Sequence, residues 1–229
     1  MVLWDVDHTL IEMRGVGRAI YERAFEAVTG QPLVHHADVS GRTEPEIIRE
    51  TLTLHDIEST DELTQQFVVA LIGGYESVKE ELAQHGRALP GASTTLAHLA
   101  EESAIHQSVL SGNLRAVAHI KLEVFGLLPY LDLRSGAYGD DSPHRPTLVG
   151  IAQARAFQRL AHRFTADNTV LIGDTPKDMA AALDGGAKSL AIASGKSSAE
   201  ELRQAGASVV LPDLLDAERV LGLVLELVG

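Results

Sequence analysis

Near its start the chain reads Val2-Leu3-Trp4-Asp5-Val6-Asp7-His8-Thr9, three apolar residues followed by two carboxylates on either side of a valine. The apolar run predicts a short buried strand that ends at Asp5. Two carboxylates at a strand end can divide two tasks. Asp5 can attack phosphorus and bind a metal, while Asp7 can protonate a leaving oxygen and then deprotonate water. An acidic turn that caps a helix would look the same, so the motif alone leaves both interpretations open.

The second half of the chain alternates apolar runs with helical patterns. Strands are predicted at residues 105–110, 131–135, 169–172, 188–193 and 208–211. Helices are predicted between most of these runs. This alternation favours a parallel sheet with helices on both faces, so the predicted fold class is α/β.

Residues 14–85 follow a different pattern, because they contain helical periodicity and no convincing strand. A helix is predicted over 14–29 and is broken by Gly30-Gln31-Pro32. Pro45 suits the first turn of a second helix, and residues 61–81 predict a third that Gly73-Gly74 weakens. We therefore expect a helical insert between the first strand and the rest of the sheet.

Composition excludes several classes of protein. The chain has 32 Asp and Glu against 19 Lys and Arg, a formal net charge of −13, so nucleic acid and membrane surfaces are not expected partners. It has no cysteine, which excludes disulfides, thiolate metal sites and a cysteine nucleophile. The first residues do not resemble a secretory signal, and the longest apolar stretches are too short to span a bilayer. We expect a cytoplasmic protein.

Three polar residues each lie just past the end of a predicted strand: Asp5, Ser111 and Asp174. In open α/β sheets, ligands bind outside the carboxyl ends of the strands, so we expect these residues to converge on one crevice. Asp174 and Asp178 offer the hard oxygen ligands that suit Mg²⁺. A plain capped helix start, with Pro176 in its first turn, is the alternative for this segment.

Ser111-Gly112-Asn113 combines a hydroxyl with backbone N–H groups ahead of a predicted helix. Such an arrangement can bind phosphate oxygens, although any isolated Ser-Gly-Asn is also a suitable N-cap. The three segments together supply a nucleophile, anion donors and metal ligands in one order along the chain. Their combination favours function over three unrelated caps.

These segments resemble the haloacid dehalogenase-like (HAD) superfamily, in particular its phosphoglycolate-phosphatase-like branch. Residues 5–10 are similar to the first motif of that family, residues 109–113 to the second, and residues 173–178 to the fourth. The resemblance spans nearly the whole chain. It implies a Rossmann-like core at residues 1–13 and 86–229, with an inserted helical cap domain at residues 14–85.

The resemblance also implies a set of site residues. Asp5 and Asp7 would be catalytic, and Mg²⁺ would be the cofactor. The implied metal ligands are Asp5, Asp7, Asp174 and Asp178. The implied substrate-binding residues are Thr9, Ser111, Gly112, Asn113 and Arg42, the last from a cap loop that the family points toward substrate. An ordinary solvated arginine is an equal alternative for Arg42.

Two positions depart from the family pattern. His8 stands where the family usually has glycine. The third family motif is a lysine, often followed by proline, and the corresponding segment here is Ser142-Pro143-His144-Arg145-Pro146. Arg145 is therefore the candidate catalytic cation, and Lys121 is a weaker substitute because it lies well inside the helix after Ser111. An arginine fork and a lysine point charge are not interchangeable.

The function expected from these residues is Mg²⁺-dependent hydrolysis of a small phosphomonoester, such as a phosphoglycolate-like compound or a sugar phosphate, through an aspartyl-phosphate. A phosphosugar mutase and a catalytically weak phosphate-binding or regulatory protein remain alternatives. Asp7 disfavours a dehalogenase, since the resembling dehalogenases lack the second carboxylate. His35 and His36 are adjacent, so their side chains should point apart, and we interpret both as surface residues.

Overall fold

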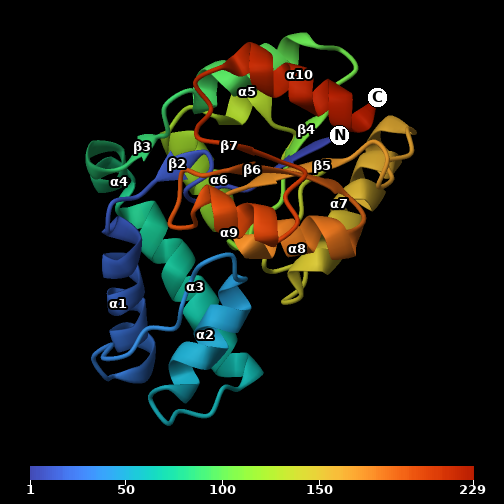
Figure 1. Cartoon of the computed structure of the whole chain (residues 1–229). Coiled ribbons are helices and arrows are strands. Elements are labelled where there is room, and N and C mark those ends of the chain that lie inside the picture. Colours follow the sequence, from blue (N-terminus) through green and yellow to red (C-terminus); the bar gives the residue numbers. More distant parts are fainter.

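Five short apolar runs form one parallel sheet in the computed structural model, which describes all 229 residues (Figure 1). The strand order is β4-β1-β5-β6-β7, and each neighbouring pair is parallel. The strands are β1 (Val2–Trp4), β4 (Gln107–Val109), β5 (Val170–Gly173), β6 (Lys188–Ile192) and β7 (Val209–Leu211). Helices flank this sheet, which confirms the predicted α/β, Rossmann-like fold class.

Alternating side chains of the strands pack against helices on opposite faces of the sheet. Val2 and Trp4 belong to an apolar cluster that includes residues of α5 (Ala92–Glu101) and α10 (Ala217–Val228). Leu3 belongs to the opposite cluster. The helices on that face are α7 (Arg145–Leu160), α8 (Pro176–Gly185) and α9 (Ala199–Gln204).

The strand predicted at residues 131–135 is wrong. A 3-10 turn, η1 (Leu128–Tyr130), leads into a loop there, and only Ala137 makes an isolated bridge to Leu110. The side chain of Asp132 accepts hydrogen bonds from the Arg134 amide and the Ser135 hydroxyl. This local hydrogen bonding holds the chain in a turn, in competition with strand pairing.

Residues 14–85 contain helices and no strand, as predicted. The helices are α1 (Val16–Thr29), α2 (Glu44–Thr53), α3 (Asp61–Ser77) and α4 (Lys79–His85). The helix predicted over 61–81 breaks at Val78 and not at Gly73-Gly74. A Cβ on Gly74 would lie 2.7 Å from Ile20 Cγ2, so this glycine allows α1 and α3 to approach closely. The chain leaves and re-enters the sheet through an antiparallel pair, β2 (Ile11–Glu12) and β3 (Arg87–Ala88).

Helix α6 (Arg115–Val124) contributes to two apolar clusters at once. Val117 and Ile120 are buried among residues of α1, α2 and α3, whereas Ala118 and Leu122 are buried in the cluster that covers the sheet. The helical insert therefore packs on α6 as well as on itself. None of the helices combines the length and the apolar character needed to cross a membrane.

Candidate active site

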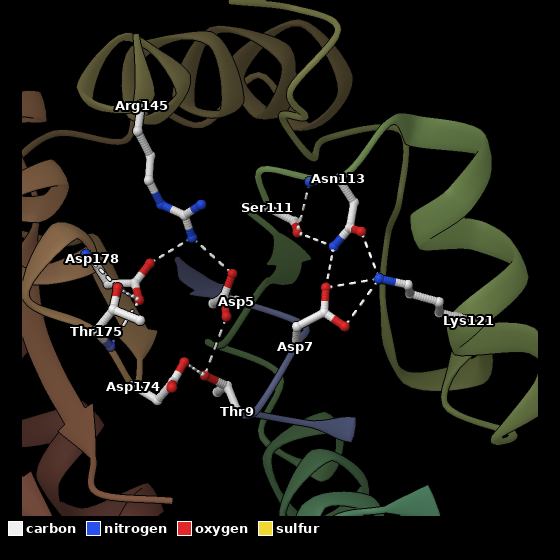
Figure 2. Close-up of polar contacts among 10 residues, drawn as sticks. All are labelled: Asp5, Asp7, Thr9, Ser111, Asn113, Lys121, Arg145, Asp174, Thr175 and Asp178. Carbon is white, nitrogen blue, oxygen red and sulfur yellow. Dashed lines mark hydrogen bonds and ion pairs between the residues drawn. The ribbon is translucent and has the colours of Figure 1, made fainter. Parts of the chain in front are cut away.

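The carboxyl ends of β1, β4 and β5 bring polar side chains to one edge of the sheet (Figure 2). Asp5 directly follows β1, and its amide donates to the Ile172 carbonyl at 2.9 Å. Asp174 directly follows β5. Ser111 lies two residues past β4, and its amide donates to the Ala137 carbonyl at 3.1 Å. Backbone hydrogen bonds thus fix the positions from which these side chains project.

Three buried carboxylates form a cluster at this edge: Asp5, Asp174 and Asp178 each offer an oxygen within 4.8 Å of the others. The Thr9 hydroxyl lies 3.3 Å from both Asp5 Oδ2 and Asp174 Oδ1. Asp178 is on the first turn of α8, where its side chain and that of Thr175 cap the helix reciprocally. The functional and the capping interpretations of this segment therefore apply together.

Arg145 lies against this cluster from the first turn of α7, and it is 7% exposed. Its Nη2 atom alone donates both to Asp5 Oδ1, at 2.7 Å, and to Asp178 Oδ1, at 2.5 Å. Its Nε is buried without a partner. Its Nη1 makes no hydrogen bond and lies on the side of Gly112, where a Cβ would be only 3.1 Å away. The guanidinium therefore retains donors that the protein does not use.

The carboxylate cluster is short of positive charge. Burial and the negative charge of Asp178 raise the pKa of Asp5 to about 7, although Arg145 opposes the shift. Burial and the charges of Asp5 and Asp178 raise the pKa of Asp174 to about 8. One guanidinium does not compensate three crowded carboxylates, because a charged group in a buried site costs free energy unless opposite charge offsets it.

This deficit of positive charge fits a divalent cation. Hard carboxylate oxygens are the ligands that Mg²⁺ prefers. Asp5 and Asp174 have oxygens held only by the long contacts to Thr9. Asp178 has both of its oxygens engaged, one by Arg145 and the other by Thr175. Of the four metal ligands implied by the resemblance, the geometry is most suitable at Asp5 and Asp174.

Asp7 does not join the cluster. Its carboxylate accepts from Lys121 Nζ at 2.8 and 3.0 Å and from Asn113 Nδ2 at 2.7 Å (Figure 2). Lys121 is 1% exposed; it also donates to Asn113 Oδ1 at 2.6 Å and lies 5.2 Å from the centre of the Tyr75 ring. Burial alone would raise the pKa of Asp7, but Lys121 and Asn113 lower it below its ordinary value. Lys121 is thus the partner of Asp7 and not a substitute for Arg145.

The Ser111-Gly112-Asn113 loop, called the Ser111 loop below, lies beside Asp5 and Asp7 (Figure 2). Asn113 donates from Nδ2 to Ser111 Oγ at 2.8 Å, which fixes both side chains. The Gly112 carbonyl accepts from the Glu44 amide at 2.8 Å, while the Gly112 N–H has no partner in the chain. A Cβ on Gly112 would overlap the Arg42 carbonyl. The glycine therefore permits a close approach of the loop that precedes α2, and it leaves one amide free.

Arg42 borders the same cavity, but its guanidinium is already engaged. It forms ion pairs with Glu46 at 2.9 Å and with Glu50 at 2.5 Å, and it donates to the Asp38 carbonyl at 3.3 Å. Only a tenth of its side chain is exposed. Substrate binding by Arg42 stays a prediction, and the geometry does not favour it.

A cavity of about 390 Å³ connects these residues with the helical insert. It is bordered by Asp5, Asp7, the Ser111 loop, Arg145 and Asp174, by Lys121 of α6, and on the helical side by residues that include His36 and three that sequence reasoning did not assign: Tyr21, Glu44 and Tyr75. His36, interpreted as a surface residue, is half-buried, because its ring packs 4.3 Å from the Tyr21 ring beside this cavity. His35 is exposed, as expected.

His8 adopts a left-handed backbone conformation, with φ of 62°. Its amide donates to the Ile11 carbonyl at 2.8 Å, and its carbonyl accepts from the Ser194 hydroxyl at 2.6 Å. Glycine adopts this conformation at no steric cost. The tight turn after Asp7 therefore accounts for the preference for glycine at this position in the resembling family.

Comparison with known proteins agrees with this geometry. A sequence model described as "haloacid dehalogenase-like hydrolase" matches residues 2–183. Among solved structures, the chain is similar to a hydrolase from Pseudomonas syringae, with 24% identity, coverage of 96% of this chain and 97% of that chain, and a TM-score of 0.72. It is also similar to a HAD hydrolase, family IA, variant 3, from Entamoeba histolytica, with 18% identity, coverage of 99% and 98%, and a TM-score of 0.72.

CbbY from Rhodobacter sphaeroides, solved in complex with phosphate, is a third similar structure, with 18% identity, coverage of 94% of each chain and a TM-score of 0.70. At these identities the structural likeness establishes the fold alone. No curated protein sequence matches the chain.

Proposed function

Since the chain belongs to the haloacid dehalogenase-like hydrolase family, we propose that it hydrolyses a small phosphomonoester, with Asp5 as nucleophile and Mg²⁺ as cofactor. The observation that carries this proposal is the position of Asp5. Its carboxylate borders the cavity at a strand end, between Arg145 and Asp174. We further propose that residues 14–85 are a cap that covers the site.

Phosphate would bind where unused donors converge. The Gly112 N–H and Arg145 Nη1 both border the cavity without a partner in the chain, and the Ser111 hydroxyl lies beside them. Donors aimed at the equatorial oxygens stabilise the charge that develops there during phosphoryl transfer. Asp5 attacks phosphorus, the bond to the leaving oxygen breaks, and the phosphoryl group is then carried on the Asp5 carboxylate.

Asp7 is the acid/base residue of this proposal. Its side chain is 30% exposed, and it borders the cavity two residues from the nucleophile. Because its pKa is lowered, Asp7 is ionised at rest; it relays a proton from the monoprotonated phosphate ester to the leaving oxygen, takes a proton from the water that attacks the aspartyl-phosphate, and releases that proton to solvent. Lys121 and Asn113 fix its orientation during both steps.

Asp5 and Asp174 would hold Mg²⁺, with Asp178 supporting Asp5 through Arg145. When bound, the ion neutralises charge on the carboxylates and on the phosphate oxygens. The same neutralisation allows Asp5 to be an unprotonated nucleophile despite its raised pKa. Arg145 supplies the permanent part of the positive charge at the site.

An aryl phosphate assayed with Mg²⁺ tests the proposal. We expect turnover by the native protein and near-complete loss in both Asp5→Asn and Asp7→Asn. Asp184→Asn, the same change at an exposed aspartate of α8, serves as the folded control. Turnover that survives Asp5→Asn would refute the covalent mechanism, and no turnover by the native protein with any small phosphomonoester would favour a binding protein.

A further inference from the structure

The carboxyl group of Glu44 lies in the wall of the cavity without a partner in the chain. Glu44 is the first residue of α2, and its amide donates to the Gly112 carbonyl at 2.8 Å, so it stands beside the Ser111 loop. Its carboxylate oxygens make no hydrogen bond and no ion pair, and they are not covered by protein. A ligand in the cavity can therefore reach them.

The carboxyl group of Glu44 faces the same space as Asp7. Burial, and then the charge of Glu44, raise the pKa of Tyr21 well above its ordinary value, so the carboxyl group lies near that side chain. The charges that act in turn on Glu44 are those of Lys121 and Asp7. Tyr21, Asp7 and Lys121 all border the cavity, and Asp7 is the residue proposed to serve the leaving oxygen. The Glu44 carboxyl group is therefore placed to contact the leaving group.

This part of the cavity is short of positive charge. Asp7 and Glu44 have one ammonium group between them, that of Lys121, and Asp7 already holds it at 2.8 Å. Burial raises the pKa of Glu44 to about 7; the charge of Lys121 opposes this shift and the charge of Asp7 adds to it. A substrate would displace the water around the carboxylate, and a carboxylate without water needs donors or positive charge in exchange. A cationic donor on the leaving group supplies both.

The arginines on the helical side of the cavity do not serve Glu44. Arg14 and Arg18 are half-exposed, and each pairs through Nε with a neighbouring glutamate. Arg42 pairs with two glutamates of α2. None of these three charges is among those that shift the pKa of Glu44. Arg14 and Arg18 can still receive a carboxylate from another part of the leaving group, so the phosphate ester of a hydroxyl amino acid suits the cavity as well as that of a simple amino alcohol.

We infer that the substrate is the phosphomonoester of an amino alcohol, whose ammonium group is bound by Glu44. The inference rests on the proposed phosphatase function and narrows its substrate class. Arg145 and the Ser111 loop hold the phosphate, Asp7 faces the ester oxygen, and Glu44 pairs with the ammonium group. No bond of that group changes in the reaction, so Glu44 determines specificity and takes no part in the chemical step. A volume of about 390 Å³ is sufficient for such a compound.

The test uses pairs of phosphomonoesters that differ in one terminal group. Phosphoethanolamine is compared with ethylene glycol phosphate, and the three-carbon aminopropyl phosphate with hydroxypropyl phosphate, each substituted on the terminal carbon. A charge-assisted hydrogen bond is stronger than a neutral one, so kcat/KM should favour the amine by at least about tenfold in one pair or both. Equal values within both pairs, or higher values for the hydroxyl compounds, would overturn the inference.

Two variants assign the preference to Glu44. Glu44→Gln removes the charge and keeps the shape, so the ratio of kcat/KM between amine and hydroxyl compound should fall at least about fivefold. Because both substrates are measured on one protein, a general loss of activity cancels in this ratio. Glu44→Asp keeps the charge on a shorter side chain and should retain a larger ratio than Glu44→Gln. Glu62→Gln, the same change at an exposed residue of α3, is the matched control and should leave both rates unchanged.

The outcomes separate this inference from the proposed function. Aryl phosphate turnover by the native protein tests phosphatase activity alone, because an aryl phosphate has no ammonium group. If that activity is present without a preference for the amines, or if Glu44→Gln keeps the native ratio, the inference is overturned and the proposed function stands. If the activity is absent, calorimetric titration of the four compounds still tests the inference, and binding of the amines no tighter than that of the hydroxyl compounds would overturn it.

Discussion

Replacing Lys121 with methionine, which has nearly the same length, would break the buried pair that holds Asp7. Removing one partner of a buried ion pair typically costs about 3–5 kcal/mol, because the other charge is left without compensation. Asp7 is 30% exposed to the cavity and can be partly hydrated, so we place the loss for Lys121→Met at the lower end, about 3 kcal/mol. For a chain of this length, that corresponds to a fall in melting temperature of roughly 6–12 °C.

The direction of the Asp7 pKa shift decides the pH at which the stability of Lys121→Met should be measured. Because the pKa of Asp7 is lowered in the folded protein, the contribution of the pair is complete above the ordinary carboxyl pKa of about 4 and is lost as the pH falls below it. Chemical denaturation at neutral pH therefore reports the full effect. Lys79→Met, which removes a partly exposed surface lysine paired with Glu76 and Glu123, is the matched control and should change stability little.

A double-mutant cycle with Asp7→Asn separates the pair from the loss of packing. If Lys121 and Asp7 stabilise each other, the double variant should be more stable than the sum of the two single losses predicts, by about 2 kcal/mol within the range seen for contacting residues. Additivity within about 0.5 kcal/mol would refute the reasoning. So would a Lys121→Met protein as stable as the Lys79→Met control.

Three further outcomes follow from the site. Arg145→Lys should leave stability unchanged, because both carboxylate contacts come from one nitrogen and Nε has no partner, and it should lower kcat/KM because the Nη1 donor is lost while the charge is kept; Arg145→Ala should lower kcat/KM further, by at least about a hundredfold, and equal losses in the two variants would contradict this. Mg²⁺ affinity, measured by calorimetric titration, should weaken as the pH falls from about 8 to about 7, because Asp174 and Asp5 then take up protons that compete with the ion. A Mg²⁺ affinity that does not change over this pH range would count against the proposed metal site. Gly112→Ala should lower the melting temperature, because the added Cβ would overlap the Arg42 carbonyl. Gly150→Ala, on an open face of α7, should instead raise stability by about 0.5–1 kcal/mol. If Gly112→Ala were the more stable variant, the loop that contains Arg42 would not pack against the Ser111 loop as described.

The sequence was sufficient to predict the residues at the strand ends. Apolar runs followed by Asp5, Ser111 and Asp174 define the edge of a parallel sheet, and the resemblance of residues 142–146 to the third family motif identified Arg145. Tyr21 and His36 could not be found this way, since His36 lies in an aperiodic segment and Tyr21 looks like one more core residue of α1. Their position beside the cavity appears only when the insert is placed against the sheet.

Lys121 did leave a signal in the sequence. It lies four residues after Val117 and three before Val124, on the apolar face of α6, where a charged residue requires a buried partner. Spacing does not reveal which carboxylate that partner is. Asp7 lies 114 residues away, and only the pairing of β1 with β4 brings the two together.

Helix α6 belongs to both apolar clusters, so it connects the helical insert to the sheet. Val117 and Ile120 anchor the helix in the insert, Ala118 and Leu122 anchor it over the sheet, and Lys121 projects from between them toward Asp7. If the insert tilted relative to the sheet while α6 stayed in place, α6 would lose its apolar contacts with the insert. If α6 moved with the insert, it would lose its contacts in the cluster that covers the sheet. A movement of the insert that carried α6 with it would therefore displace Lys121, and with it the side chain of Asp7, the proposed acid/base residue.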